Sequence, residues 1–119
     1  MTIRISELLN VSVGVSVGGS GGLTWKVTSL NTSAIPGNGY IVNTVSGEIS
    51  LTLPASPIAG DQIGVTDYNN GFETNKCTIL RNGKNIMGLQ EDFVCDVNGT
   101  SIVFVYADAT QGWKILYGV

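Results

Sequence analysis

The sequence predicts an all-β protein, a small antiparallel β-sandwich or barrel-like domain with an extended N-terminal arm. Of its 119 residues, 35 are Val, Ile or Thr, and these branched side chains favour pleated strands over helices. Short alternating runs of apolar and polar residues recur roughly every 8–12 residues, with turn residues between them. No helical pattern of about ten residues interrupts these runs, so a fold of alternating strands and helices is not expected.

A Gly-rich run, Gly18–Gly22, divides the chain into an arm and hinge (residues 1–22) and a β-rich body (residues 23–119). Between Val11 and Val17 every odd position is Val, and Ser or Gly stands between them. This period of two predicts a strand with one apolar face. We expect the arm to add a strand to a partner protein. The docking residues would be Ile3, Ile5, Leu8, Leu9, Val11, Val13, Val15 and Val17.

Within the body, alternation places Ile49, Leu51 and Leu53 toward the core from one strand, and Ile63 and Val65 from the next. Polar residues alternate with each set, which is typical of strands that are buried on one face. The predicted strands of the body are 23–30, 40–45, 48–53, 61–66, 76–81, 84–87, 93–97, 100–106 and 113–117.

Three short connections carry the residues that tight turns need. Asn82-Gly83, Asn98-Gly99 and Ser46-Gly47 each lie between two predicted strands. Gly, and less readily Asn, adopts the positive φ angles of two-residue hairpin loops. Each connection is therefore predicted to close a hairpin.

The composition argues against several classes of function. Without His, the chain has no Ser–His–Asp triad, no Cys–His pair and no imidazole metal ligand. Its net charge is −3 and its six basic residues are scattered, so no nucleic-acid partner is expected. No run approaches the ~18 apolar residues of a membrane span, and the first ten residues lack the order of a signal peptide. We expect a non-enzymatic protein with no cofactor, no metal and no membrane partner.

Two cysteines, Cys77 and Cys95, lie 18 positions apart in predicted strands. A disulfide would require their Cα atoms to lie about 4.4–6.8 Å apart, and the sequence leaves that pairing open. Two small buried hydrophobic residues are the favoured interpretation.

Carboxylates could form the acid and nucleophile pair of a glycosidase. The candidates are Asp61, Asp67, Glu91, Asp92 and Asp96. Each falls in or beside a predicted loop, where solvated carboxylates are common. We therefore interpret them as loop residues and assign no catalytic group.

Several aromatic residues are candidates for contacts with other molecules. Tyr68 and Phe72 fall in a polar loop and are expected to be exposed, where they could stack on a sugar. Trp113 lies in a predicted strand, as do Tyr40 and Tyr117. These three are interpreted as core or subunit-interface residues.

The low charge content predicts an oligomer. Only 13% of the residues are charged and the mean hydropathy is +0.24, and the strand Ser101–Tyr106 is apolar on both faces. A strand of this kind needs a neighbour on its second face. We expect a homotrimer of about 37 kDa, three chains of 12.5 kDa, with Phe104, Tyr106 and Trp113 at or near the subunit contacts.

Six stretches within residues 40–117 carry a family resemblance. They are Leu53-Pro54-Ala55, Ala59-Gly60-Asp61, Ile79 to Gly88, Glu91-Asp92, Ser101 to Tyr106 and Trp113-Lys114-Ile115. Together they resemble a small β module found near the ends of bacteriophage tail-fibre and related virion surface proteins. Met1 to Leu8 also resembles the leader of many phage fibre proteins. The chain differs from such fibres because only the Gly-rich hinge separates leader and module.

The resemblance implies a virion structural protein, usually a homotrimer, that assembles in the host cytoplasm and has no catalytic residues. Its partners would be copies of itself and other virion proteins, with a host surface glycan as a further candidate. A tail-fibre-like or tail adaptor protein is the first hypothesis. A capsid decoration protein (cement or head-fibre) and a free-standing carbohydrate-binding module are the alternatives.

Overall fold

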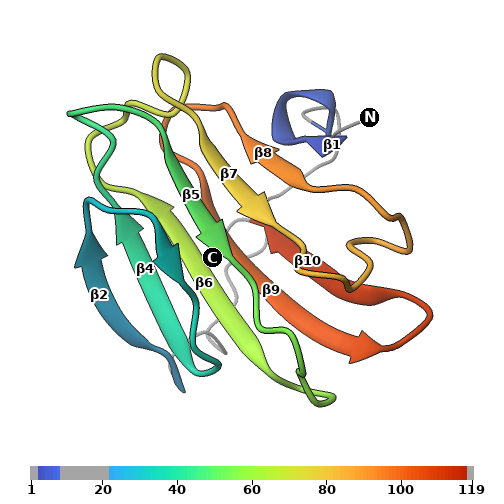
Figure 1. Ribbon diagram of the computed structural model, residues 1–119. Helices are drawn as coiled ribbons and strands as arrows, with labels where there is room; N and C mark the ends of the chain where they lie inside the picture. Colours follow the sequence, from blue (N-terminus) through green and yellow to red (C-terminus); the bar gives the residue numbers. More distant parts are fainter. Residues whose placement is uncertain (1–2, 9–21, 118–119) are drawn as a thin grey trace.

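The computed structural model describes residues 3–8 and 22–117. Its strands are β1 (Ile3–Arg4), β2 (Thr24–Thr28), β3 (Thr32–Ser33), β4 (Asn38–Val42), β5 (Ile49–Thr52), β6 (Gln62–Asp67), β7 (Cys77–Leu80), β8 (Phe93–Cys95), β9 (Ser101–Asp108) and β10 (Gly112–Tyr117). A single turn of 3-10 helix, η1, spans Ile5–Leu8. The strands form two five-stranded sheets that pack as a sandwich (Figure 1).

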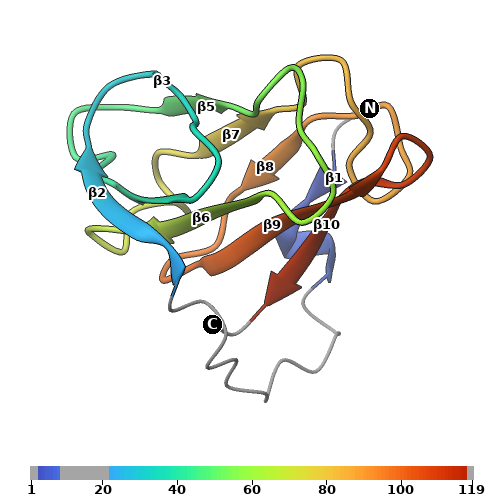
Figure 2. The ribbon, with the colours of Figure 1, turned by 90° about the horizontal axis from the view of Figure 1, so that it is seen from below.

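Along the chain, strands β2 to β7 belong alternately to one sheet and to the other. Sheet A has the order β1-β8-β7-β5-β3, and sheet B has the order β10-β9-β6-β4-β2. From β2 to β7, each strand in sheet B is followed by a strand in sheet A, and strands two apart pair in parallel. Residues 24–80 therefore wind as three stacked coils, each with one strand in each sheet. Figure 2 shows the two layers edge-on.

The expectation of an antiparallel sandwich is therefore wrong for the first half of the body. Antiparallel pairs occur among the later strands, where β7 pairs with β8, β6 with β9, and β9 with β10. The physical reason is the connections, because each loop from β2 to β7 carries the chain across to the opposite sheet. A strand that returns to its own sheet after one full coil runs in the same direction as before.

The turn residues adopt the expected geometry without closing the expected hairpins. Asn82 and Gly83 have φ of 52° and 87°, and Gly99 has φ of 77°. Ser46-Gly47 and Asn98-Gly99, however, join strands that lie in different sheets. After Asn82-Gly83 the chain forms an isolated bridge at Ile86 in place of the predicted strand 84–87.

The core lies between the two sheets. Ile49, Leu51 and Leu53 are buried there, as are Ile63 and Val65, which confirms the predicted inward faces of these strands. Neighbouring strands place like residues together, as in the pairing of Leu51 with Ile79 in sheet A. Each coil thus contributes apolar side chains to one continuous core.

Candidate functional site

The N-terminal residues are attached to the body. β1 pairs in parallel with β8, and the Ile3 N–H donates a hydrogen bond to the Asp92 carbonyl at 3.1 Å. Ile5 is buried in the core. The backbone N–H and Oγ of Ser6 both donate to the Asp96 carboxylate, at 3.0 and 2.6 Å.

The expectation that Ile3 and Ile5 dock on a partner is therefore wrong, because both side chains pack on the core of their own chain. Leu8 ends η1. The other predicted docking residues, Leu9, Val11, Val13, Val15 and Val17, lie outside the described residues.

The three aromatic residues expected at subunit contacts are buried within one chain. Phe104 packs edge-on against Phe93, with ring centroids 5.8 Å apart, and Tyr106 packs in the same manner against Trp113 at 5.3 Å. Phe104, Tyr106 and Trp113 all belong to the core. The expectation for these residues is wrong, because side chains that fill the sandwich are not available to a second chain.

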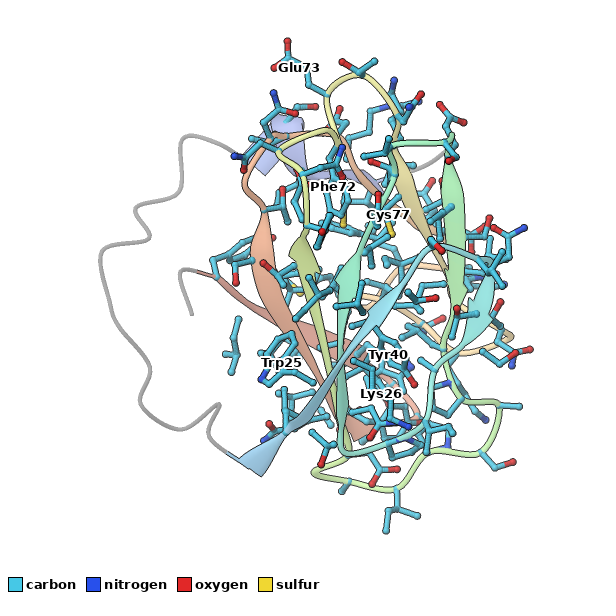
Figure 3. The ribbon with its side chains drawn as sticks, turned by 90° about the vertical axis from the view of Figure 1, so that its left-hand side faces the viewer. Trp25, Lys26, Tyr40, Phe72, Glu73 and Cys77 are labelled. Carbon is cyan, nitrogen blue, oxygen red and sulfur yellow. The ribbon has the colours of Figure 1, made fainter. Side chains whose placement is uncertain are left out.

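Only one of the two loop aromatics is exposed. Tyr68 is 54% exposed, as expected, whereas Phe72 is fully buried, so the expected exposure of Phe72 is wrong. The loop after β6 folds back because the Phe72 N–H donates to Asp67 at 3.1 Å. This hydrogen bond directs the Phe72 ring into the core, close to the Cys77 end of β7 (Figure 3).

The Asp67 carboxylate is the centre of a hydrogen-bonded cluster. Its Oδ1 accepts the N–H groups of Asn69 and Gly71, and its Oδ2 accepts those of Phe72 and Gly99. The four distances lie between 3.1 and 3.3 Å. Asp67 therefore joins the loop after β6 to the turn before β9, and all four of these donors are backbone N–H groups.

Three of the other candidate carboxylates have similar local roles. Asp61 accepts the N–H of Ile58, and Asp92 accepts the N–H of Arg81. Asp96 accepts from Ser6. Across residues 3–8 and 22–117, no group of three or more Cys, Asp or Glu side chains is placed to hold a metal ion.

The two cysteines lie side by side on neighbouring strands of sheet A. Cys77 and Cys95 are register partners on β7 and β8, and both are buried, free thiols. Burial, followed by the charge of Asp67, raises the pKa of Cys77 to about 12. Burial also raises the pKa of Cys95, and the neighbouring Cys77, Asp96 and Asp67 add to the rise. Both thiols are therefore protonated at neutral pH and pack as small hydrophobic residues, as the sequence indicated.

The outer faces of the two sheets differ in polarity. On sheet A, several outward side chains carry hydroxyl groups. These residues are Ser33, Ser50, Thr52 and Thr78. On sheet B, the outward positions are mainly apolar. We call this surface the Trp25 face and define it by Trp25, Val27, Ile41, Val103, Val105 and Leu116.

Trp25 lies flat on the outer side of sheet B, over two residues that lack side chains. A Cβ atom on Gly39 would overlap the indole ring, and one on Gly64 would lie 2.6 Å from its Cη2. Gly39 and Gly64 are register neighbours of Trp25 on β4 and β6. The two glycines therefore form a seat for the ring, which remains 38% exposed. Figure 3 shows Trp25 and Tyr40 on opposite sides of sheet B.

The strand prediction did not single out this face. The predicted strand 23–30 contains Trp25 and Val27 two positions apart, and in the structure both lie on the outer side of sheet B. The additional signal was the pair of glycines at outward positions of β4 and β6, since Gly within a strand often marks the close approach of another group.

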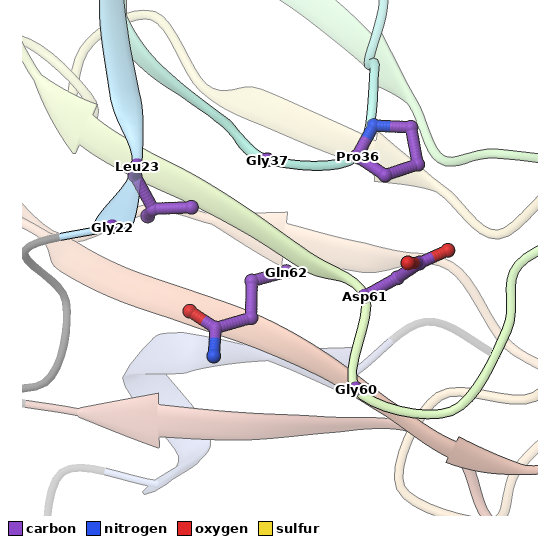
Figure 4. Close-up of a pocket in the computed structure, with 7 residues that line it drawn as sticks. All are labelled: Gly22, Leu23, Pro36, Gly37, Gly60, Asp61 and Gln62. Atoms are coloured by element: carbon purple, nitrogen blue, oxygen red, sulfur yellow. The ribbon is translucent and has the colours of Figure 1, made fainter.

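A shallow hollow of about 370 Å³ lies at the end of the Trp25 face where β6 begins (Figure 4). Its lining contains three glycines, and Leu23 connects it to the Trp25 face because the Leu23 side chain also lies over Gly64. Asp61 and Gln62 provide the polar side chains, and Asp61 already accepts the Ile58 N–H. The lining residues are Gly22, Leu23, Pro36, Gly37, Gly60, Asp61 and Gln62.

In comparisons with known proteins, no family model matches this chain and no curated protein is similar to it. The described part of the chain contains no helix that combines the length and apolar character needed to cross a membrane.

Proposed function

We propose that the chain is a structural component of a bacteriophage virion, a homotrimeric tail-fibre-like or tail adaptor protein that uses its N-terminal arm for attachment. The observation that carries the proposal is the Trp25 face, an apolar outer surface on a chain with only 13% charged residues. Apolar patches of this kind on one sheet face are typical of proteins that assemble. The fibre-like motifs of residues 40–117 support the same function.

The attachment is assigned to the part of the arm that follows Leu8, because Ile3 and Ile5 pack on their own chain. The Val alternation between Val11 and Val17 remains the feature that fits strand addition to another protein. This segment lies between Leu8 and Gly22, so the chain joins it to the described body at both of its ends.

The roles of the carboxylates favour a structural protein over a glycosidase. Asp61, Asp67 and Asp92 accept hydrogen bonds from backbone N–H groups, and Asp96 accepts from Ser6. Such contacts fix loops. The carbohydrate-binding alternative receives less support than the sequence offered, because Phe72 is buried and, of the two loop aromatics expected to stack on a sugar, Tyr68 alone is exposed.

The test is to locate the protein in purified particles by electron microscopy with an antibody against the body. We expect label on the virion, and its position distinguishes a tail component from a capsid decoration protein. A variant with Val11, Val13, Val15 and Val17 all changed to Ser should fold but be lost from particles. The matched control changes Ser12 and Ser16 to Ala and should be incorporated normally. Particles without the wild-type protein would contradict the proposal.

A further inference from the structure

We infer that the Trp25 face is the surface through which copies of this chain associate, and that its occupant is a second copy. The inference rests on the proposed function, because it assigns a surface to the proposed oligomer. It replaces Phe104, Tyr106 and Trp113, which fill the core, as the subunit contacts.

The exposure of the face is the first argument. Val27 is 59% exposed, Leu116 is 39% exposed and Trp25 is 38% exposed. The register places Trp25, Val103 and Leu116 in one row across sheet B, with Gly39 and Gly64 between the first two. The row crosses the sheet from edge to edge, and its exposed members are Trp25 and Leu116 on the two edge strands, because Val103 between them is only 1% exposed. Apolar area of this kind gains free energy when a partner removes it from water.

The charge of the face is the second argument, and it points to a second copy. Outward positions on the five strands of sheet B hold no Asp or Glu, and Lys114 is their one charged residue. The Lys114 ammonium donates to Gln111 at 3.3 Å. Each copy has a formal charge of −3, so contact through this face keeps the carboxylates of two copies apart. Interfaces between identical chains are also more apolar than transient ones.

The position of the face at an open edge is the third argument. Among the described residues, β2 is paired on one side only, with β4. Trp25 and Val27 both lie on this edge strand. Three copies whose faces meet around a common axis can bury the ring and protect the unpaired edge together, which is the usual requirement for an exposed edge strand.

The experiment is sedimentation equilibrium of the full chain at micromolar concentration. We expect wild-type protein at about three times the chain mass of 12.5 kDa, and about a threefold fall in apparent mass for Val27→Asp and for Leu116→Asp. The matched controls are Leu30→Asp and Ile58→Asp, because Leu30 and Ile58 are 74% and 71% exposed outside this face. Both controls should keep the wild-type mass.

A second measurement needs no variant. The chain contains two tryptophans, of which Trp113 is buried and Trp25 is exposed. Acrylamide quenching should therefore report mainly on Trp25, and it should increase when dilution dissociates the oligomer. Constant quenching across a dissociation detected by sedimentation would overturn the inference.

Three other outcomes would also overturn it. The first is a monomeric wild-type chain, as expected if residues 9–21 of the same chain cover the face. The second is an unchanged mass for Val27→Asp and Leu116→Asp. The third is dissociation of the two control variants to the same extent. Failure here is separable from failure of the proposed function. Virion-located protein that still assembles after Val27→Asp contradicts only this inference, whereas association through the face by a protein absent from particles contradicts only the virion function.

Discussion

At the scale of single residues, the Asp67 carboxylate connects two loops. Its two oxygens accept four backbone N–H groups from two loops. The side chain is half-buried, where hydrogen bonds to a charged acceptor are stronger than those to a neutral one.

We expect Asp67→Asn to lower the free energy of unfolding by about 1.5–3 kcal/mol. The amide that replaces the carboxylate keeps one acceptor oxygen and introduces a donor that faces N–H groups. Urea denaturation measures the change. The control is Glu48→Gln, in an exposed loop, which should leave the midpoint unchanged. Equal midpoints for both variants would contradict this role of Asp67.

The two thiols give a pH dependence. Cys77 has an ordinary pKa of 9.0 that rises to about 12 in the folded protein, and the pKa of Cys95 is also raised. A raised pKa means that the unfolded chain loses these protons first, so stability is complete below pH 9 and declines as the pH rises toward 12. The free energy of unfolding, measured in urea at pH 7 and pH 10.5, should be lower at pH 10.5.

The double variant Cys77→Ala and Cys95→Ala tests the cause. It should be less stable at pH 7 because methyl groups leave space in the core, but its stability should change less between the two pH values. A pH dependence equal to that of the wild type would assign the effect to other groups, such as Tyr117, whose pKa burial also raises.

At the scale of elements, the seat of Trp25 connects β2 to β4 and β6. Gly64→Ala would place a Cβ 2.6 Å from the indole and 2.8 Å from Leu23. We expect the ring to move and the free energy of unfolding to fall by about 1–3 kcal/mol, as in other overpacked sites. Urea denaturation, followed by circular dichroism, measures the loss.

Two further variants make that prediction specific to the ring. Gly22→Ala should be neutral, because nothing lies within 4 Å of the added Cβ. In a Trp25→Ala background, Gly64→Ala should cost less than in the wild type, since one of its two clashing side chains is absent. Independent, additive effects of Trp25→Ala and Gly64→Ala would rule out the seat.

The turns provide a separate prediction at this scale. Gly83 and Gly99 have φ of 87° and 77°, where a branched side chain is strained. Gly83→Val and Gly99→Val should each lower the free energy of unfolding by about 1–3 kcal/mol. Thermal melting of both variants beside Gly22→Ala, where nothing lies within 4 Å of the added Cβ, measures the effect. Three identical melting temperatures would contradict it.

The strands and turns were predictable because they depend on local chemistry. Ile63 and Val65 alternate with outward residues in the sequence and are buried in the structure, and Asn82-Gly83 has the positive φ angles that its composition indicates. The pairing was not predictable in the same way. After Ser46-Gly47 the chain could turn back beside β4 or cross to sheet A. The choice depends on which apolar faces pack against each other in the core.

The same limit explains the errors among the candidate residues. Phe72 lies in a polar loop, and its inward position accompanies hydrogen bonds of that loop to Asp67, including one from the Phe72 N–H across five residues. Phe104 is on a strand with apolar residues on both faces, so periodicity could not decide which face meets the core. On the outward side of that strand, Val105 is half-buried and lies beside the row that contains Trp25.

At the scale of the whole molecule, the N-terminal residues stabilise the body. Deleting residues 1–8 would remove β1, the buried Ile5 and both hydrogen bonds from Ser6 to Asp96. We expect the free energy of unfolding to fall by at least about 2 kcal/mol, since removing a buried Ile alone costs that much. A truncated chain with the wild-type urea midpoint would show that residues 1–8 do not stabilise the body.

The winding of residues 24–80 has a consequence for how such a protein can change in length during evolution. Each coil places one strand in each sheet and pairs only with the coils beside it. Duplication of one coil would therefore lengthen both sheets by one strand, or about 4.8 Å, while the antiparallel pairs of β8, β9 and β10 stayed as they are. In an antiparallel meander, by contrast, the insertion of one strand reverses the direction of every strand that follows it. This architecture can therefore lengthen by whole coils, and new coils would be added at the β2 end of the stack.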